Sequence, residues 1–290
     1  MILSLILATL TATPAKFPVV VCGDTVILAA GQYATVTVPR LDCPDDKRLT
    51  IDASAATIKT ATIRATKGVD WSGGVFNPPL SMPVAVTIDM SERVRFSGAL
   101  ITGARVGVTV VRSGYIDVIG NRFDGVRSDG VNITVSHHAN IIGNQCLRFQ
   151  PILANYDASG KLLIDGDHPD CIQGWTTPGT PPLSDVLVAG NTADGYMQGY
   201  WFGATSKDGY DRITVVFNEA RIGAYQGVNV VGGRDTVISH NRILPTPGAR
   251  LLGGNRGLIW PWVQMTGTGI ACGNVVAPQA SQYGTGDCTK

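Results

Sequence analysis

The sequence lacks an excess of either charge and has few charged residues. Of its 290 residues, 23 are Lys or Arg and 22 are Asp or Glu, so the net charge is +1 and only 16% of residues are charged. A nucleic-acid surface or a polybasic membrane anchor needs a basic excess, which is missing here. The hydrophobic fraction of 44% argues against a disordered chain. We therefore expect a globular protein with no nucleic-acid partner.

Runs of the helix-favouring residues Ala, Glu, Lys and Leu are scarce, whereas Gly is common at 35 residues. This composition is typical of many short strands joined by tight turns. Long apolar runs are also missing. The opening segment MILSLILATLTATPAK is too short to cross a membrane, so we expect no membrane span. It resembles a signal peptide but has no Lys or Arg before Lys16, and it is alternatively a first strand or cap of the fold.

None of the six cysteines forms a CxxC pair, which argues against a zinc site. Two pairs bracket short segments near the chain ends, namely Cys22 with Cys43 and Cys272 with Cys288. They are either two disulfides that pin the ends of an extracellular fold or free thiols. We expect the remaining two, Cys146 and Cys171, to be interior packing residues.

The sequence contains a repeat. Short segments such as IDVIGNRF and ANIIGNQC alternate apolar residues and end at an asparagine, with a shortest spacing of 23 residues. These anchor asparagines are Asn121, Asn144, Asn191, Asn218, Asn241 and Asn274. A second strand follows most anchors after seven or eight residues, as in SDGVNITV. Strands and Gly/Asn turns at this period predict a solenoid, in which the asparagines of neighbouring coils stack about 4.8 Å apart.

The repeat resembles the single-stranded right-handed parallel β-helix of the pectin-lyase-like superfamily, from about Gly23 to Val276, and CGDTVILAAGQY resembles its opening coil. The resemblance implies an all-β parallel β-helix solenoid over residues 22–276. Residues 1–21 would be a signal peptide or N-terminal cap, and residues 277–290 a C-terminal tail. The superfamily includes polysaccharide lyases, glycoside hydrolases and phage tail spikes.

Insertions single out one central coil. The step from Asn121 to Asp129 is 8 residues, whereas the corresponding step from Asn144 to Asp170 is 26, which leaves 18 extra residues around RFQPILANYDASGKLLIDG. Six extra residues follow around TTPGTPPL, and about five around ATSKDGYD. Solenoids place insertions as loops on a working face. We therefore expect a groove at the strand that DHPD opens.

Acidic residues concentrate at this strand, in the stretch DGDHPDCIQGW. Alignment of the second strands puts Asp129 and Asp170 one coil apart, about 5 Å. Asp165, Asp167 and His168 lie just upstream, and these five are the candidate catalytic residues. Close carboxylates repel, so we expect one pKa to rise and one to fall, as in an acid–base pair. The structural alternative is that Asp and Pro gather where the chain re-enters a strand.

Such a cluster supports more than one chemistry. Two carboxyl groups can hydrolyse a glycosidic bond. Histidine beside acids can instead abstract a proton from a uronic acid ring. Acid clusters can also bind Ca²⁺, the one cofactor that the stretch suggests.

The aligned second strands also predict substrate-binding residues. One row of aligned positions reads Asp129, Asp170, Gln198, Gln226 and Arg256, and the next reads Asn132, Gln173, Trp201, Asn229 and Ile259. Tryptophans at outward positions can stack on sugar rings, and amides can fix their orientation. The candidate substrate-binding residues are Asn132, Gln173, Trp175, Gln198, Trp201, Asn229 and Arg256.

Superfamily motifs do not decide the chemistry. The Gly-His-Gly motif of polygalacturonase-like enzymes is missing, and Asp167–Asp170 reads Asp-His-Pro-Asp where mannuronan epimerases have Asp-Pro-His-Asp. Our first hypothesis is a secreted or periplasmic monomer that binds a polysaccharide or cell-surface glycan and cleaves it, as a lyase or glycoside hydrolase. The alternatives are a homotrimeric phage tail spike or fibre, located in the virion, and a non-catalytic surface binding module.

Overall fold

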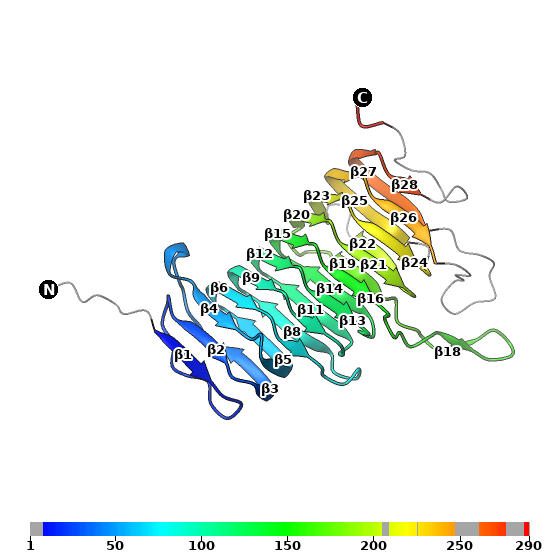
Figure 1. The fold of residues 1–290 in the computed structure, drawn as a ribbon. Coiled ribbons are helices and arrows are strands. Elements are labelled where there is room, and N and C mark those ends of the chain that lie inside the picture. Colours follow the sequence, from blue (N-terminus) through cyan, green and yellow to red (C-terminus); the bar gives the residue numbers. More distant parts are fainter. Residues whose placement is uncertain (1–7, 205–208, 225, 247–260, 277–286, 290) are drawn as a thin grey trace.

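The computed structural model describes residues 8–204, 209–224, 226–246, 261–276 and 287–289. All pairings of its large 26-stranded sheet are parallel, and a single 3-10 turn, η1 (Asp45–Lys47), is the only helical element in these ranges. The chain winds from the N-terminal to the C-terminal end as a stack of coils (Figure 1). The predicted parallel β-helix is confirmed. No described helix has the length and apolarity needed to cross a membrane.

Three stacked faces make up each coil. Face A consists of β8 (Val84–Asp89), β11 (Val106–Val111), β14 (Asp129–Thr134), β19 (Asp170–Thr176), β22 (Gln198–Ala204), the first part of β25 (Gln226–Ser239) and the first part of β27 (Trp262–Cys272). Face B consists of β1 (Thr9–Ala12), β2 (Thr25–Leu28), β4 (Leu49–Asp52), β6 (Lys67–Ser72), β9 (Glu92–Ser97), β12 (Gly114–Ile119), β15 (His137–Ile142), β20 (Leu183–Ala189), β23 (Tyr210–Val216) and the second parts of β25 and β27.

Face C consists of β7 (Val75–Phe76), β10 (Leu100–Ile101), β13 (Arg122–Asp124), β16 (Gln145–Leu147), β21 (Thr192–Gly195), β24 (Glu219–Ile222), β26 (Arg242–Pro245) and β28 (Val275–Val276). The longer strands β3 (Gly31–Val38) and β5 (Ala56–Arg64) pair with each other, and β5 continues into both β7 and β8. Since β1 pairs with β2, part of the segment 1–21 lies within the solenoid.

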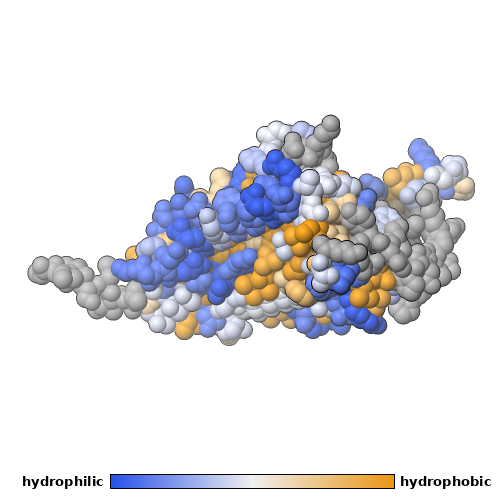
Figure 2. Space-filling view, turned by 90° about the horizontal axis from the view of Figure 1, so that it is seen from above, coloured by the Kyte–Doolittle hydropathy of each residue, from blue (hydrophilic) through white to orange (hydrophobic). Residues whose placement is uncertain are grey.

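Apolar side chains fill the interior in aligned rows. On face A, one such row contains Val108, Val131, Ile172, Tyr200 and Val228, all fully buried. Burial of one side chain of this size contributes about 1.5–3 kcal/mol, and each coil depends on its neighbours for it. Outside, the N-terminal coils are largely hydrophilic when the molecule is seen from above (Figure 2).

The predicted asparagine ladder is confirmed. The anchor asparagines are buried, and each side-chain oxygen from Asn144 to Asn274 accepts hydrogen bonds from the backbone and side-chain nitrogens of the preceding anchor. The residue before each anchor has a positive φ, and it is usually glycine. At two coils the position is occupied by Phe217 (φ 55°) and His240 (φ 55°), whose rings stack.

Three disulfides form, including Cys22–Cys43 and Cys272–Cys288 at the two ends of the solenoid. The disulfide alternative is therefore correct for these two pairs. The expectation that Cys146 and Cys171 serve as packing residues was wrong: both are buried, but they are bonded to each other. They lie 25 positions apart in the sequence because the large insertion separates them. The bond joins β16 to β19, the strands before and after this insertion.

The insertions surround one coil, as predicted. Between β16 and β19 the chain forms an antiparallel hairpin, β17 (Asn155–Tyr156) and β18 (Leu162–Ile164), which projects sideways from the coils (Figure 1). Residues 177–182 form the second loop, between β19 and β20. Most of the third insertion, at 205–208, lies outside the described residues.

Candidate functional site

A cavity of about 100 Å³ opens on face A beside the large insertion. It is lined by His168, Asp170, Gln173, Gln198, Trp201 and Gln226. Strands β19, β22 and β25 supply five of these residues, because consecutive rungs place Asp170 opposite Gln198 and Gln173 opposite Trp201. Five predicted site residues therefore come together here. Gln226 appeared in the aligned row, but sequence reasoning did not name it as a binding residue.

Asp129 lies behind Asp170 on the neighbouring rung and is 6% exposed. Its Oδ1 accepts hydrogen bonds from the Asp170 backbone N–H and the Ser128 hydroxyl, both at 3.2 Å. Its Oδ2 accepts one from the Asn132 amide at 3.3 Å. Three donors stabilise the ionised form of this carboxyl group, so Asp129 is the natural anion of the pair.

Asp170 has a different environment. It is 1% exposed, and its Oδ2 accepts one hydrogen bond, from Gln173 Nε2 at 3.1 Å. Its Oδ1 is buried without a hydrogen-bond partner among the described residues. A carboxyl group with little support for its charge, next to an anion, holds a proton more firmly.

Burial raises the pKa of Asp129 to about 6. Burial, together with the charge of Asp129, raises the pKa of Asp170 well above that of an ordinary carboxyl group. The expectation that one of the two pKa values falls was wrong, because the sequence could not show that both groups lose their contact with water. Around neutral pH the pair therefore holds a proton, and the hydrogen bonds assign it to Asp170.

Two predicted binding residues support the pair from outside the cavity lining. Asn132 Nδ2 donates to Gln173 Oε1 at 2.8 Å, and Asn132 Oδ1 accepts from Trp175 Nε1 at 2.6 Å. Together with the bond from Gln173 to Asp170, this forms a chain of hydrogen bonds from the surface to the acid. Trp175 is 37% exposed at the outer end of this chain.

Asp167 does not join the carboxyl pair. Its oxygens lie 3.0 Å from Arg127 nitrogens and 3.7 Å from Arg105 Nε, and Oδ2 accepts the Ile152 backbone N–H at 2.8 Å. These contacts tie the two ends of the inserted loop to the coil below. Asp165, in contrast, is exposed on the loop. The structure therefore brings neither residue to the cavity, and neither arginine partner was recognised from the sequence.

The remaining candidates have varied positions. The Trp201 ring lies against its own strand over Gly203, where a Cβ atom would be 1.9 Å from the ring. Asn229 follows Trp201 in register but is 3% exposed, and its Oδ1 has no described hydrogen-bond partner. Arg256 lies outside the described residues, and the register position assigned to it beside Gln226 belongs to Trp262. Likewise, the residue beside Asn229 on the next strand is Gln264 and not Ile259.

No three His, Cys, Asp or Glu side chains converge as metal ligands in the part of the chain that the structure describes. The carboxyl pair supplies two, and the other residues that line the cavity are three glutamines, Trp201 and the exposed His168. The arrangement is suited to proton transfer, because a buried protonated acid faces a cavity with fixed polar groups around it.

Comparisons with known proteins find similar folds only. Neither a protein-family model nor a curated protein sequence matches the chain. Among solved structures, an alginate lyase from Paenibacillus sp. str. FPU-7 is 12% identical with a TM-score of 0.42, covering 94% of this chain and 96% of that one. The surface adhesin PfbA of Streptococcus pneumoniae is 12% identical with a TM-score of 0.42, covering 76% and 77%. ORF18 of Geobacillus virus E2 is 12% identical with a TM-score of 0.36, covering 78% and 51%.

Proposed function

We propose that this protein cleaves a polysaccharide in the face A cavity, with Asp170 as the general acid. The observation that carries the proposal is the Asp170 carboxyl group, which lines the cavity and has one oxygen without a partner among the described residues. It holds a proton because burial, together with the charge of Asp129 behind it, raises its pKa. Cleavage of a glycosidic bond requires a proton for the leaving oxygen. The cavity amides and Trp201 supply the hydrogen bonds and the apolar surface that position a sugar.

Hydrolysis is the reaction that the described lining favours. Asp170 donates its proton to the glycosidic oxygen as the bond to the anomeric carbon breaks. A water molecule attacks that carbon, and His168, an exposed residue of the cavity lining, accepts its proton. Asp129 does not touch the substrate and acts by positioning Asp170 and keeping it protonated. No lysine or arginine is among the residues that line the cavity, so nothing described there neutralises a uronic acid carboxylate.

Elimination is the second candidate because His168 lies at the same cavity as the acid. In that reaction His168 would abstract the ring proton next to a uronic acid carboxylate, and Asp170 would again protonate the leaving oxygen. A uronate substrate would then need a cation from beyond the described lining, such as Ca²⁺ or one of the residues that the structure leaves undescribed.

The three disulfides bear on the compartment, because disulfide bonds persist in oxidising surroundings. They support an extracellular or periplasmic protein, and they are equally compatible with the surface of a virion.

Turnover on a panel of neutral and acidic polysaccharides, with and without Ca²⁺, tests the function. We expect new reducing ends on a neutral glycan without the ultraviolet absorbance of an unsaturated uronic acid. New reducing ends with that absorbance would establish elimination. No products on any glycan, together with a trimeric mass in solution, would favour the tail spike or the binding module instead.

The rate should depend on pH through Asp170. Only its protonated form can act as an acid, so activity should fall as pH rises through its pKa, which lies well above the ordinary carboxyl range. Replacing Asp129 with asparagine removes the negative neighbour and lowers the pKa of Asp170. We therefore expect the alkaline loss of activity to occur at a lower pH in the D129N variant than in the wild type. A profile of kcat/KM against pH checks this, and an unmoved alkaline limb would contradict it.

A further inference from the structure

A second and larger groove lies on face B, away from the cavity. Its volume is about 480 Å³, and it is lined by Asp45, Arg48, Arg93, Tyr115, Asp117, His138, Asn140 and Asp185. None of these residues lines the face A cavity. The groove extends from the turn η1 over β9, β12 and β15 to β20, which are consecutive rungs of the same face. These four strands are separated by three spacings of about 4.8 Å, so the groove is about 14 Å long, which suits an extended ligand.

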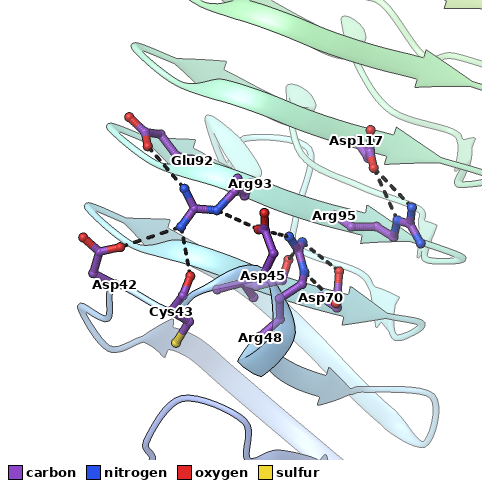
Figure 3. A network of polar contacts seen from close by, with 10 residues as sticks. Asp42, Cys43, Asp45, Arg48, Asp70, Glu92, Arg93, Arg95 and Asp117 are labelled. Carbon is purple, nitrogen blue, oxygen red and sulfur yellow. Dashed lines mark hydrogen bonds and ion pairs between the residues drawn. The ribbon is translucent and has the colours of Figure 1, made fainter.

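The charges at the N-terminal end of this groove are paired with each other (Figure 3). Arg48 donates to both oxygens of Asp70 at 2.8 Å. Arg93 Nε lies 2.9 Å from Asp45, and Arg95 lies 3.4 Å from Asp117. Each pair fixes its partners in place and leaves no arginine of this network without a carboxylate. A strongly anionic ligand would have to compete with these carboxylates, whereas uncharged hydroxyl groups can bond to the paired groups as they stand.

An exposed aromatic residue lies in the middle of the groove. Tyr115 is 54% exposed and stacks on the ring of His138, with centroids 4.6 Å apart and planes 21° from parallel. Beside it, Asn140 Nδ2 donates to Asp117 Oδ1 at 2.9 Å, so this amide is also held in one orientation. Fixed planar polar groups next to an amphipathic ring match a sugar, which has hydroxyl groups around an apolar C–H face.

We propose that the groove on face B is a second glycan-binding site, for a neutral oligosaccharide segment. It would hold one part of the polymer while another part lies at Asp170. The choice of a glycan as ligand rests on the proposed function, but the groove is separate from the residues that carry the proposed cleavage.

The test uses the full chain with Asp170→Asn, so that the ligand is bound but not consumed. Affinity electrophoresis through gels that contain xylan, galactomannan or a soluble glucan measures binding, with alginate and polygalacturonate gels as acidic counterparts. Tyr115→Ala should weaken binding to a neutral polysaccharide by about tenfold, the effect of removing one central aromatic contact. Asn140→Ala, which removes an exposed side chain, should weaken it in the same gels.

Phe217→Ala is the matched control. Phe217 is 65% exposed, has a φ of 55° against 56° for Tyr115, and stacks on His240 as Tyr115 stacks on His138, but it lies outside the groove. Its loss should leave binding unchanged. The proposal is overturned if Tyr115→Ala binds as tightly as Phe217→Ala, if only the acidic gels retard the protein, or if no gel retards it.

Removal of Trp201 from the cavity separates this inference from the proposed function. Binding that survives Trp201→Ala but is lost with Tyr115→Ala supports the groove on face B, whether or not the wild type shows turnover. Binding that Trp201→Ala alone abolishes places the only glycan site on face A and overturns the inference, even when turnover is present.

Discussion

Replacing Asp170 with asparagine should abolish turnover while the protein stays folded. The substitution removes the proton that we assign to the leaving oxygen, and general acid catalysis contributes about 10²- to 10⁴-fold to a rate. Stability should change little, because asparagine has nearly the same shape as aspartic acid. The raised pKa of Asp170 also means that the wild-type side chain is already uncharged. The asparagine amide can still accept the hydrogen bond from Gln173. Reducing-end assays give kcat/KM, and thermal unfolding monitored by circular dichroism gives Tm.

Asp194→Asn is the control for this variant. Asp194 is an exposed carboxylate on β21 of face C, two strands after the one that carries Asp170, and it does not line the cavity. Its replacement should leave both kcat/KM and Tm close to the wild-type values. If Asp170→Asn keeps full activity at an unchanged Tm, Asp170 is not the acid and the proposed mechanism fails.

A charge placed inside the solenoid should prevent stable folding. Val108 on β11 is fully buried and stacks between Val86 and Val131 on the neighbouring rungs. An aspartate there would bury an unpaired carboxylate against apolar side chains, at a cost of about 4 kcal/mol or more. Native proteins in general are stable to unfolding by only about 5–15 kcal/mol. We expect Val108→Asp to lower the urea midpoint sharply or to abolish soluble expression.

The next residue on the same strand is the control. Thr109 is half-buried, and its side chain points to the opposite side of the strand from Val108. Thr109→Asp should shift the urea midpoint by far less, since its charge can reach water. Equal losses from the two variants would contradict the described orientation of β11, and a larger loss from Thr109→Asp would mean that its side chains face the other way.

The repeat could be predicted because its cause is local. Each sign of the repeat reflects one turn or one strand: the asparagines, most of which follow a glycine, the alternating apolar residues, and the spacing of 23 residues. The structure confirms the ladder from Asn121 to Asn274. The same register brought Asp170, Gln198, Gln173 and Trp201 together correctly. The alignment failed beyond Gln226, where Trp262 occupies the position given to Arg256, because Trp262 lies 21 positions after Asn241 whereas Gln226 lies 8 after Asn218.

The candidate site itself needed the tertiary structure. Asp165, Asp167 and Asp170 look equivalent in the stretch DGDHPD, yet Asp165 is exposed, Asp167 is paired with Arg127, and only Asp170 lines the cavity. Arg127 lies 40 positions from Asp167 and has no local pattern that would reveal the pair. The disulfide between Cys146 and Cys171 was missed for the same reason, because the insertion hides their proximity.

The sequence by itself determined the solenoid, its asparagine ladder and the coil that bears the insertions, since these follow from periodic side-chain patterns and turn residues. Only the tertiary structure decided which carboxyl group holds a proton, which acid anchors the inserted loop and where the second groove lies. Those properties depend on burial and on contacts between residues of different coils. A pKa changes with the water and the charges around a group, and neither can be read from the residues next to it in the chain.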